Sequence, residues 1–546
     1  MSLCTHIEEP ICETDDSPIV EEVIGKLSEV PPGSKKTFEV RGRKILVIND
    51  NDKLYAINGL CSHYNFALEN GIYANGRIRC PLHGACFNVR NGDIEDYPGF
   101  DSLHSYKVTE RNGDLVISTT EKKLASDRRT RYVKKVEANE FRPVVVIGGG
   151  IAASTFIEHS RLNGLNQRII VISEEEHTPY DRVLVSKKPS ATGEDIRMRN
   201  DQYYIDRNVL FMLETTVTSV DTKKRIVYLA NGDDLTYGKL VIATGGNVRK
   251  LAAPGADLKN IHYVRKVGQA NAIHKAHEGK NVVILGSSFI GMEMASSLAA
   301  GAASVTVISS SPEPLPVFAS DIGKGVRLKF EEKNVKFQLG TSIIAIRGNE
   351  EGCIEKVILA NGEELAADLL VCGIGVTPAT EFLKGSKVKL DERGFVEVDE
   401  KYRTNVDYVY AIGDCVTFPL PNFGIDRINI QHFQTAQTHG QQLGYSICGK
   451  PIPGPVVPYF WTLFFFAFGV KFAGCTQGST KEYTFGEPEA LNFTRYYLKK
   501  DRVVAVASGG PTSAPAQFAE IFKKGIEVTL KDLKNSKDHQ WSHLLL

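Results

Sequence analysis

The chain has 546 residues, of which 42% are hydrophobic and 24% are charged, and this composition is typical of soluble globular proteins. Lys plus Arg and Asp plus Glu number 65 each, so no net charge favours nucleic acid as a partner. Ten cysteines in a chain of this size do not indicate a disulfide scaffold, so a reducing, cytoplasmic location is the simpler expectation. A chain this long exceeds a single hydrophobic core and should form several domains.

Residues 1–17 are expected to form an acidic tail, because they contain Asp and Glu but no Lys or Arg. This argues against a secretory signal and against a cleavable mitochondrial presequence, while association with mitochondria stays open. The apolar stretch 456–470 is shorter than the ~20 residues that span a membrane. Its aromatic residues and internal proline favour buried strands, so we expect no transmembrane segment.

Residues 18–122 predict a small all-β domain. Short runs at 37–40, 44–48 and 115–118 have the alternating pattern of half-buried strands. Asn–Gly pairs at 75–76, 91–92 and 112–113 separate such runs, and this dipeptide is typical of tight hairpin turns.

Two pairs of candidate metal ligands lie inside this domain, in the sequences Cys61-Ser-His63 and Cys80-Pro-Leu-His83. Two thiolates and two imidazoles on separate loops form the ligand set of a Rieske [2Fe–2S] cluster, in which the thiolates bind one iron and the imidazoles bind the other. A structural zinc site uses the same ligand types, but its usual C-x2–4-C and H-x3–5-H spacing is absent. We therefore expect all four residues to bind a [2Fe–2S] cluster.

The neighbours of these ligands predict a low reduction potential. High-potential members of the Rieske family carry a disulfide between the two loops; here Cys86 stands at one of the two positions and Phe66 at the other. Ala85 and Phe87 replace the serine and tyrosine whose hydroxyls are directed at the cluster in those members. Because such hydrogen bonds raise the potential, we expect a ferredoxin-like centre.

A charge-rich linker at 123–140 should lead into a larger α/β region. There the apolar run 144–147 opens into Gly148-x-Gly150-x-x-Ala153, the dinucleotide-binding fingerprint. The first glycine permits the turn, the second lets the backbone approach a pyrophosphate, and the alanine allows close packing of helix on strand. Alone the motif is weak, since glycine turns join many buried strands to helices.

Two later features fit a cofactor at this turn. The expected second strand, 168–172, is followed by Glu174, which we assign to a ribose hydroxyl of the adenosine half; a helix-capping or solvated glutamate is the alternative. The run 240–246 is another buried strand and contains Thr244-Gly245 at its end, where small residues allow close approach to a cofactor.

A second fingerprint follows at Gly286-x-Ser288-x-x-Gly291, again between an apolar run and a helix. The repeat indicates two nucleotide-binding modules, the second inserted in the first. The next strand, 304–308, ends in serines without the acid that binds a 2′-hydroxyl or an arginine for a 2′-phosphate, so NAD(H) and NADP(H) both stay open. Asp414 ends a later strand and can direct its carboxylate at the ribitol of a flavin.

In their order along the chain, these motifs resemble those of the pyridine-nucleotide FAD oxidoreductases. The sequences PYDR at 179–182, with SK at 186–187, and PYFWT at 458–462 narrow the resemblance to the ferredoxin-reductase branch. With the Rieske domain in front, the whole chain is similar to the Rieske-containing apoptosis-inducing-factor-like proteins. The resemblance implies an N-terminal all-β Rieske domain, two interleaved Rossmann-like α/β nucleotide-binding domains and a C-terminal α+β domain.

The expected domains are a tail at 1–17, the Rieske domain at 18–122, a linker at 123–140, an FAD-binding domain at 141–265 and 377–452, an NAD(P)-binding domain at 266–376 and a C-terminal interface domain at 453–546. The resemblance places FAD on Gly148, Gly150, Ala153, Glu174, Arg182, Lys187, Thr244, Gly245 and Asp414, and the nicotinamide nucleotide on Gly286, Ser288 and Gly291. It also implies that Lys187 and Glu293 form a catalytic pair beside the flavin; a purely structural ion pair is the alternative.

These inferences predict an oxidoreductase that passes electrons from NAD(P)H through FAD to the Rieske cluster and on to an unknown acceptor, with a protein as one candidate. The C-x4-C of disulfide reductases is absent at 182–188, which argues against thiol–disulfide chemistry. Two alternatives stay open: a redox-responsive cell-death or signalling effector with little turnover, and an FAD-linked oxidase. The aromatic segment 459–468 is a candidate face for a homodimer.

Overall fold

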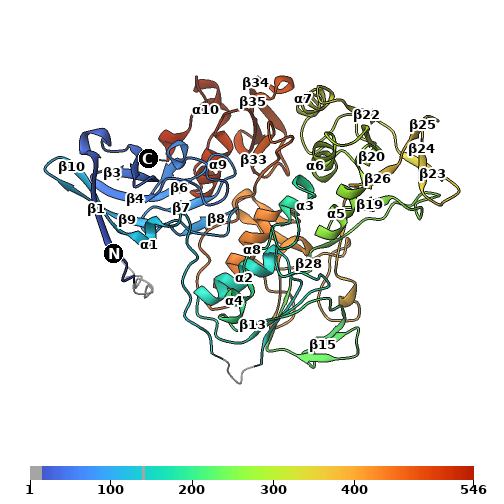
Figure 1. Ribbon diagram of the computed structural model, residues 1–546, viewed down its shortest axis with the longest axis horizontal. Coiled ribbons are helices and arrows are strands. Elements are labelled where there is room, and N and C mark those ends of the chain that lie inside the picture. Colours follow the sequence, from blue (N-terminus) through green and yellow to red (C-terminus); the bar gives the residue numbers. More distant parts are fainter. Residues whose placement is uncertain (1–14, 138–141, 546) are drawn as a thin grey trace. The chain divides into compact units, whose positions relative to one another are not determined.

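The computed structural model describes residues 15–137 and 142–545 (Figure 1). Most of the expected acidic tail, residues 1–14, and the end of the expected linker, 138–140, lie outside the described residues, as does residue 141. Within the described part of the chain, no helix is long and apolar enough to cross a membrane.

The chain forms two compact units. The first comprises the residues up to Lys135, together with Ser513–Glu527 and the residues from Lys534 onward; the second comprises Val136–Thr512 and Val528–Leu533. The expected domain boundaries stay predictions. The sequence did not suggest that part of the C-terminal region belongs to the same unit as the Rieske domain.

The first unit contains two antiparallel sheets. The larger has the order β1-β10-β9-β4-β3-β2 and the smaller the order β5-β6-β7-β8. Their strands are β1 (Ile19–Lys26), β2 (Lys35–Val40), β3 (Arg43–Asp50), β4 (Lys53–Asn58), β5 (Ile72–Ala74), β6 (Arg77–Arg79), β7 (Cys86–Asn88), β8 (Ile94–Asp96), β9 (Ser105–Arg111) and β10 (Asp114–Thr120). The predicted hairpin turn between β5 and β6 is confirmed, since Asn75 and Gly76 have φ angles of 48° and 77°.

Short helices complete this unit. They are η1 (Leu27–Glu29), η2 (Leu68–Asn70), α1 (Glu121–Leu124), α9 (Ala514–Lys523) and η7 (Ser542–Leu544). The small sheet buries Ile78 and Phe87 on one side. Because side chains alternate along a strand, Arg77 and Arg79 point to the other side, where they bond to α9.

The second unit is built on two parallel sheets. The first has the order β13-β12-β11-β17-β29 and contains β11 (Val144–Ile147), β12 (Ile169–Ile172), β13 (Val209–Met212), β17 (Lys239–Ile242) and β29 (Val409–Ala411). The helices of this part are α2 (Ile151–Leu162), α3 (Val183–Lys187), α4 (Asp201–Ile205) and α8 (Phe433–Ser446). Val144, Val145 and Val146 are fully buried, as expected for a parallel strand covered on both faces.

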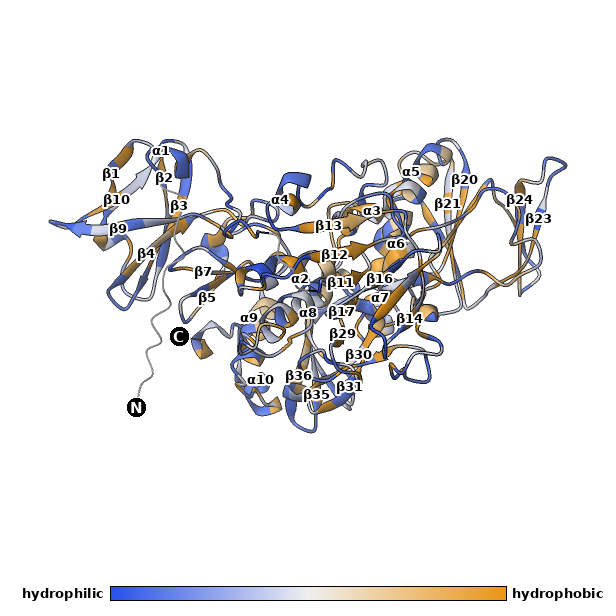
Figure 2. Cartoon of the chain, turned by 90° about the horizontal axis from the view of Figure 1, so that it is seen from below, coloured by the Kyte–Doolittle hydropathy of each residue, from blue (hydrophilic) through white to orange (hydrophobic). Residues whose placement is uncertain are grey.

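The second parallel sheet has the order β19-β26-β20-β21-β22. It contains β19 (Ile261–Tyr263), β20 (Asn281–Leu285), β21 (Ser304–Ser309), β22 (Val335–Leu339) and β26 (Leu369–Cys372), with helices α5 (Val267–Ala276), α6 (Phe289–Leu298) and α7 (Ser320–Glu331). All of these strands fall between β17 and β29 of the first sheet, so the predicted insertion of one module in the other is confirmed. The central strands of both sheets are predominantly hydrophobic (Figure 2).

Smaller elements surround the two parallel sheets. They are β14 (Val217–Asp221), β15 (Ile226–Leu229), β16 (Asp234–Thr236), β18 (Gly246–Val248), β23 (Ile343–Gly348), β24 (Ile354–Leu359), β25 (Glu364–Ala366), β27 (Val376–Pro378), η3 (Glu381–Leu383), β28 (Val396–Glu397), η4 (Gly413–Cys415), β30 (Val416–Leu420), η5 (Pro421–Phe423) and β31 (Ile425–Ile428).

A C-terminal antiparallel sheet has the order β32-β33-β36-β35-β34. Its strands are β32 (Tyr459–Trp461), β33 (Val470–Gly474), β34 (Lys481–Glu487), β35 (Asn492–Lys499) and β36 (Arg502–Gly509), with η6 (Pro488–Ala490) before β35 and α10 (Leu530–Asn535) after the sheet. The expectation of buried strands throughout 456–470 is wrong in the middle of that stretch. Phe465 and Phe466 form a left-handed turn, and Phe466 is 73% exposed although Phe464 is fully buried.

Candidate functional site

The four predicted cluster ligands lie on two loops of the first unit. Cys61 and His63 follow β4, whereas Cys80 and His83 lie in the turn that joins β6 to β7. Each turn is closed by its own backbone: the amide of Cys61 donates to the carbonyl of Phe66 at 2.9 Å, and the amide of Cys80 donates to the carbonyl of Ala85 at 2.8 Å. The structure thus brings all four side chains to one end of the small sheet.

The donor atoms suit an iron–sulfur cluster. The Nδ1 atoms of His63 and His83 are 3.1 Å apart, and the thiols of Cys61 and Cys80 lie side by side, each residue only 1% exposed. Burial lowers the pKa of His63 to about 3, so its imidazole is neutral, the form that binds a metal. Cys86 turns away from the two loops, and its thiol lies 3.6 Å from Oε1 of Glu520. Ligation by these residues stays a prediction.

The first fingerprint forms an open turn between β11 and α2. Gly148 has a φ of 106°, and a Cβ there would lie 2.3 Å from the carbonyl oxygen of Ala243 and 3.0 Å from Cα of Thr244, so this position requires glycine. Gly150 is the N-cap residue of α2 without a side-chain cap, and a Cβ there would meet no atom within 4 Å. Ala153 is fully buried. Open space before an uncapped helix N-terminus fits a pyrophosphate.

Charged side chains bond to one another around this module. Arg182, at the start of α3, donates from Nη2 to Oε1 of Glu175 at 2.7 Å and from Nη1 to the carbonyl of Arg265 at 2.5 Å. Nη2 of Arg265 lies 3.7 Å from Oδ2 of Asp414. Burial raises the pKa of Asp414, and the two guanidinium groups counteract this effect. Together these groups can orient the hydroxyl and phosphate groups of a dinucleotide.

Sequence reasoning missed two members of this group. Glu174, the predicted ribose ligand, is exposed after β12, whereas its neighbour Glu175 accepts hydrogen bonds from Tyr180 and Arg182. Three consecutive glutamates gave no local signal to choose between them. Arg265 lies in no motif, but a Cβ on Gly245 would lie 2.9 Å from its Nη2, so the glycine after Thr244 leaves room for this guanidinium.

The predicted catalytic pair joins the two modules. Lys187 ends α3 in the first module, Glu293 lies on α6 in the second, and their side chains form an ion pair. The hydroxyl of Ser186 donates to the other carboxylate oxygen at 2.5 Å, and the Lys187 ammonium lies 5.1 Å from the centre of the Trp461 ring. Burial and the nearby charge of Lys187 lower the pKa of His432 to about 4, so this imidazole is neutral at pH 7.

The second fingerprint repeats the first turn with one change. Gly286 has a φ of 108°, and a Cβ there would lie 2.4 Å from the carbonyl oxygen of Gly373. A Cβ on Gly291 would lie 1.9 Å from the carbonyl oxygen of Gly286, so the third glycine is needed for packing of α6 on β20. Ser288 is exposed and makes no capping hydrogen bond to the first turn of α6, which leaves those amides available to a phosphate.

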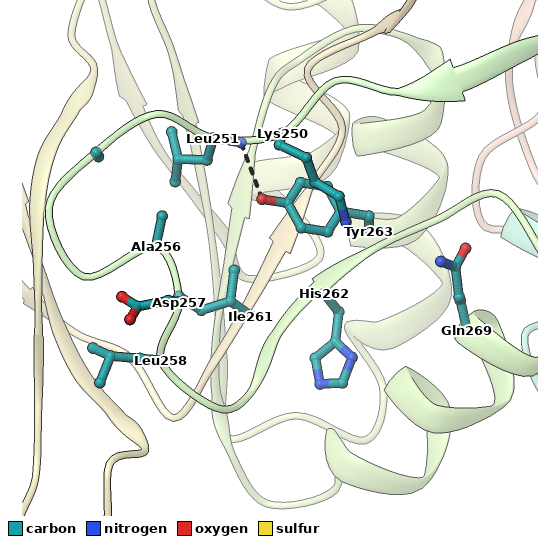
Figure 3. Close-up of a pocket in the computed structure, with 10 residues that line it drawn as sticks. Lys250, Leu251, Ala256, Asp257, Leu258, Ile261, His262, Tyr263 and Gln269 are labelled. Carbon is teal, nitrogen blue, oxygen red and sulfur yellow. Dashed lines mark hydrogen bonds between the residues drawn. The ribbon is translucent and has the colours of Figure 1, made fainter. Parts of the chain in front are cut away.

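The end of β21 carries a serine instead of an acidic residue. Ser309 is buried, and its hydroxyl is hydrogen-bonded to that of Ser287 at 2.7 Å. A separate cavity of about 710 Å³ lies beside β19, where Lys250 covers the ring of Tyr263 at 4.0 Å (Figure 3). Its lining includes none of the predicted site residues, so this cavity is separate from both fingerprints.

Two family models match the chain. One, described as pyridine nucleotide-disulphide oxidoreductase, matches residues 142–440, and the other, the Rieske [2Fe-2S] domain, matches residues 21–107. The chain is 32% identical to apoptosis-inducing factor 3 of Mus musculus over 521 residues, which cover 94% of this chain and 86% of the relative.

Reductases also match part of the chain. Rubredoxin-NAD(+) reductase of Pseudomonas putida is 32% identical over 324 residues, which cover 58% of this chain and 83% of the relative. A chain of the crystallised covalent putidaredoxin reductase–putidaredoxin complex superposes with a TM-score of 0.69 at 24% identity, covering 73% of this chain and 97% of that chain. At that identity the structural likeness shows the fold alone.

Proposed function

We propose a function from the family of the chain, which belongs to the pyridine nucleotide-disulphide oxidoreductases, among the Rieske-containing relatives of apoptosis-inducing factor 3. The proposed function is to carry electrons from NAD(P)H through FAD to the chain's own cluster. It is an NAD(P)H-dependent oxidoreductase of the ferredoxin-reductase type, with FAD, a [2Fe–2S] cluster and a nicotinamide nucleotide as its cofactors. A bound flavin accepts a hydride and can release the two electrons singly, which a one-electron cluster requires.

The observation that carries this proposal is the ion pair between Lys187 and Glu293. It connects α3, which follows the PYDR sequence, with α6, which begins at the second fingerprint, so it lies where the two modules meet. The two side chains are only 5% and 10% exposed. A cation held at a fixed position in a site of low exposure stabilises negative charge that develops on a neighbouring reacting group.

The remaining residues of this unit have binding roles in the proposal. Gly148 and Gly150 let the FAD pyrophosphate approach the start of α2, while Arg265 holds the carboxylate of Asp414 toward the ribitol. On the nicotinamide side, Gly286 and Gly291 shape the turn at α6, and Ser288 leaves the helix amides free. The end of β21 carries neither an acidic side chain that would repel a 2′-phosphate nor an arginine that would bind one, so the proposal includes NADH and NADPH without a preference.

The electrons then leave the cluster for an external acceptor. Among the described ranges of the chain, no second group of ligands with the 2-His-1-carboxylate composition lies near the Rieske loops. Since the ferredoxin-reductase relatives are named for electron-carrier proteins, we propose a one-electron acceptor protein as the partner.

Turnover with a one-electron acceptor tests this route. Purified holoprotein should reduce cytochrome c with NADH or NADPH, and Cys61→Ser should lower this rate at least tenfold while flavin reduction by the nucleotide continues. Cys353→Ser, which changes a half-buried cysteine of the second unit, is the matched control and should behave as the wild type. If Cys61→Ser leaves the cytochrome c rate unchanged and the NADH-dependent electrons appear as peroxide, the protein is an FAD-linked oxidase and the proposed route is wrong.

A further inference from the structure

A buried ion-pair network lies behind the second cluster loop. Arg79 immediately precedes Cys80, and its side chain is only 4% exposed. Its Nε donates to Oε1 of Glu520 at 2.7 Å, and Glu520 is only 2% exposed. Glu520 lies on α9, so a helix 441 residues away in the sequence supplies the counter-ion.

The same guanidinium also holds the loop itself. Nη1 of Arg79 donates to the carbonyl of Gly84 at 2.6 Å, and Gly84 directly follows His83. Arg79 is paired across the hairpin with Cys86, whose thiol donates to the same carboxylate oxygen of Glu520. Glu520 therefore connects both ends of the loop that carries Cys80 and His83 to α9, through Arg79 at one end and Cys86 at the other.

The network is balanced in charge. Asp96 bonds to Arg77 and Arg79 at 2.5 Å each and pairs with Lys523, which lies one helical turn after Glu520. Arg77 also contacts Glu95 at 2.7 Å. Three cations thus face three carboxylates. Burial opposes ionisation of Glu520, but the guanidinium groups of Arg79 and Arg77 hold its pKa below the usual value, so the carboxylate is charged.

The group is not a metal site of its own. Cys86, Asp96 and Glu520 lie close enough to share an ion, but both carboxylates are already occupied by arginine and lysine side chains. A cation would have to displace these partners and leave buried guanidinium groups unpaired, which is strongly unfavourable. The hydrogen bonds of Arg79 instead hold the loop that carries Cys80 and His83.

We propose that Arg79 and Glu520 are positioning residues for the cluster: helix α9 fixes the second cluster loop through this pair, and the charges of the pair tune the cluster's reduction potential. This inference rests on the proposed ligation by Cys61, His63, Cys80 and His83. Reduction adds one negative charge to the cluster, so a nearby carboxylate opposes it and a nearby guanidinium favours it. Neither effect is strongly screened, because the pair is buried.

The test uses full-length holoprotein and an EPR-monitored redox titration at one pH. Glu520→Gln should raise the midpoint potential and Arg79→Gln should lower it, while Arg79→Gln/Glu520→Gln should return toward the wild-type value. Glu39→Gln makes the same change at an exposed position of β2 and should leave the potential unchanged. A role limited to stability would not produce shifts of opposite sign.

The double variant covers the case in which a single variant does not fold. It leaves no unpaired buried charge, so it should fold. It lacks the charged hydrogen bond to the carbonyl of Gly84, so it should lose its cluster faster than the Glu39→Gln control. The decay of the cluster's visible absorption bands measures this loss. The proposal is overturned if both single variants shift the potential in the same direction, if neither moves it, or if the double variant keeps its cluster as long as the control. A wild-type protein without a Rieske EPR signal would instead contradict the proposed ligand set.

Discussion

The two dinucleotide modules of the second unit repeat one local geometry in different surroundings. The first glycines have φ angles of 106° and 108°, and in both turns a Cβ would collide with a carbonyl oxygen of a neighbouring strand's C-terminal loop, at 2.3 and 2.4 Å. The first module adds a group of charged side chains, Arg182, Glu175, Arg265 and Asp414. The second has Ser288 and Ser309 where related motifs carry a glycine and an acid. We therefore propose that the turn allows a dinucleotide to bind and that the surrounding side chains set the affinity.

Alanine at the first glycine of each fingerprint should have the largest effect and should distinguish the functions of the two modules. Gly148→Ala should abolish FAD binding, and Gly286→Ala should retain FAD but abolish its reduction by NAD(P)H, because each adds a clash and about 1–3 kcal/mol of backbone strain. Flavin absorbance per protein and reduction by dithionite distinguish the outcomes. Gly232→Ala, with a φ of 92° but no atom within 4 Å of the added Cβ, is the control. Loss of flavin from Gly286→Ala would contradict the separation.

The connection between the modules can be broken at Glu293. Glu293→Gln should lower the rate of flavin reduction by NAD(P)H about 100-fold, the size of one electrostatic contact to a reacting group, because Lys187 loses the carboxylate that holds it. Stopped-flow absorbance measures the rate, and Glu392→Gln, at an exposed position, serves as the control. A variant that is less stable but reduces its flavin at the wild-type rate would indicate a purely structural pair.

The buried carboxyl group of Asp181, in the first module, predicts that the stability of the protein depends on pH. Burial raises the pKa of Asp181 from 3.8 to about 6, so the folded state binds this proton more tightly than the unfolded state. The contribution of Asp181 to stability therefore falls as pH rises from about 4 to 6 and stays unfavourable above. Asp181→Asn should remove this penalty and stabilise the protein at pH 7 by about 3 kcal/mol.

Urea unfolding of the wild type and of Asp181→Asn at several pH values measures this difference. The asparagine oxygen can still accept the hydrogen bond that the amide of Val183 donates to Asp181, so the start of α3 is preserved. A stability difference that is constant between pH 4 and pH 7 would show that Asp181 does not titrate in this window.

The smallest expected effect concerns the serine in the second fingerprint. Ser288→Gly should lower KM for NAD(P)H about threefold, or ~0.6 kcal/mol, with kcat unchanged, because the hydroxyl makes no capping bond and its removal lets the pyrophosphate come closer. Steady-state kinetics with NADH and NADPH measure this change. An increase in KM would mean that the Ser288 hydroxyl itself binds the nucleotide.

Local patterns predicted the fold well wherever a strand leads directly into a turn. The apolar runs 144–147 and 282–285 correspond to β11 and β20, because buried parallel strands are continuous apolar sequences. The four proposed cluster ligands were likewise predicted from their spacing within two short loops, and the structure brings their side chains together. Long-range partners left no such signal: nothing near Arg79 indicates that its counter-ion is Glu520, and nothing near Asp414 indicates Arg265. Such ion pairs depend on the tertiary fold, so a single sequence does not reveal them.

Anaerobic stopped-flow mixing of the holoprotein with NADH or NADPH tests the central claim most directly, with the flavin and cluster bands followed separately. The proposed route predicts that the flavin band bleaches first and that the cluster band then bleaches to one electron per protein, with Cys61→Ser showing only the flavin phase. A cluster that stays oxidised while the flavin is fully reduced would contradict the account, because the two centres would then not form one electron-transfer path.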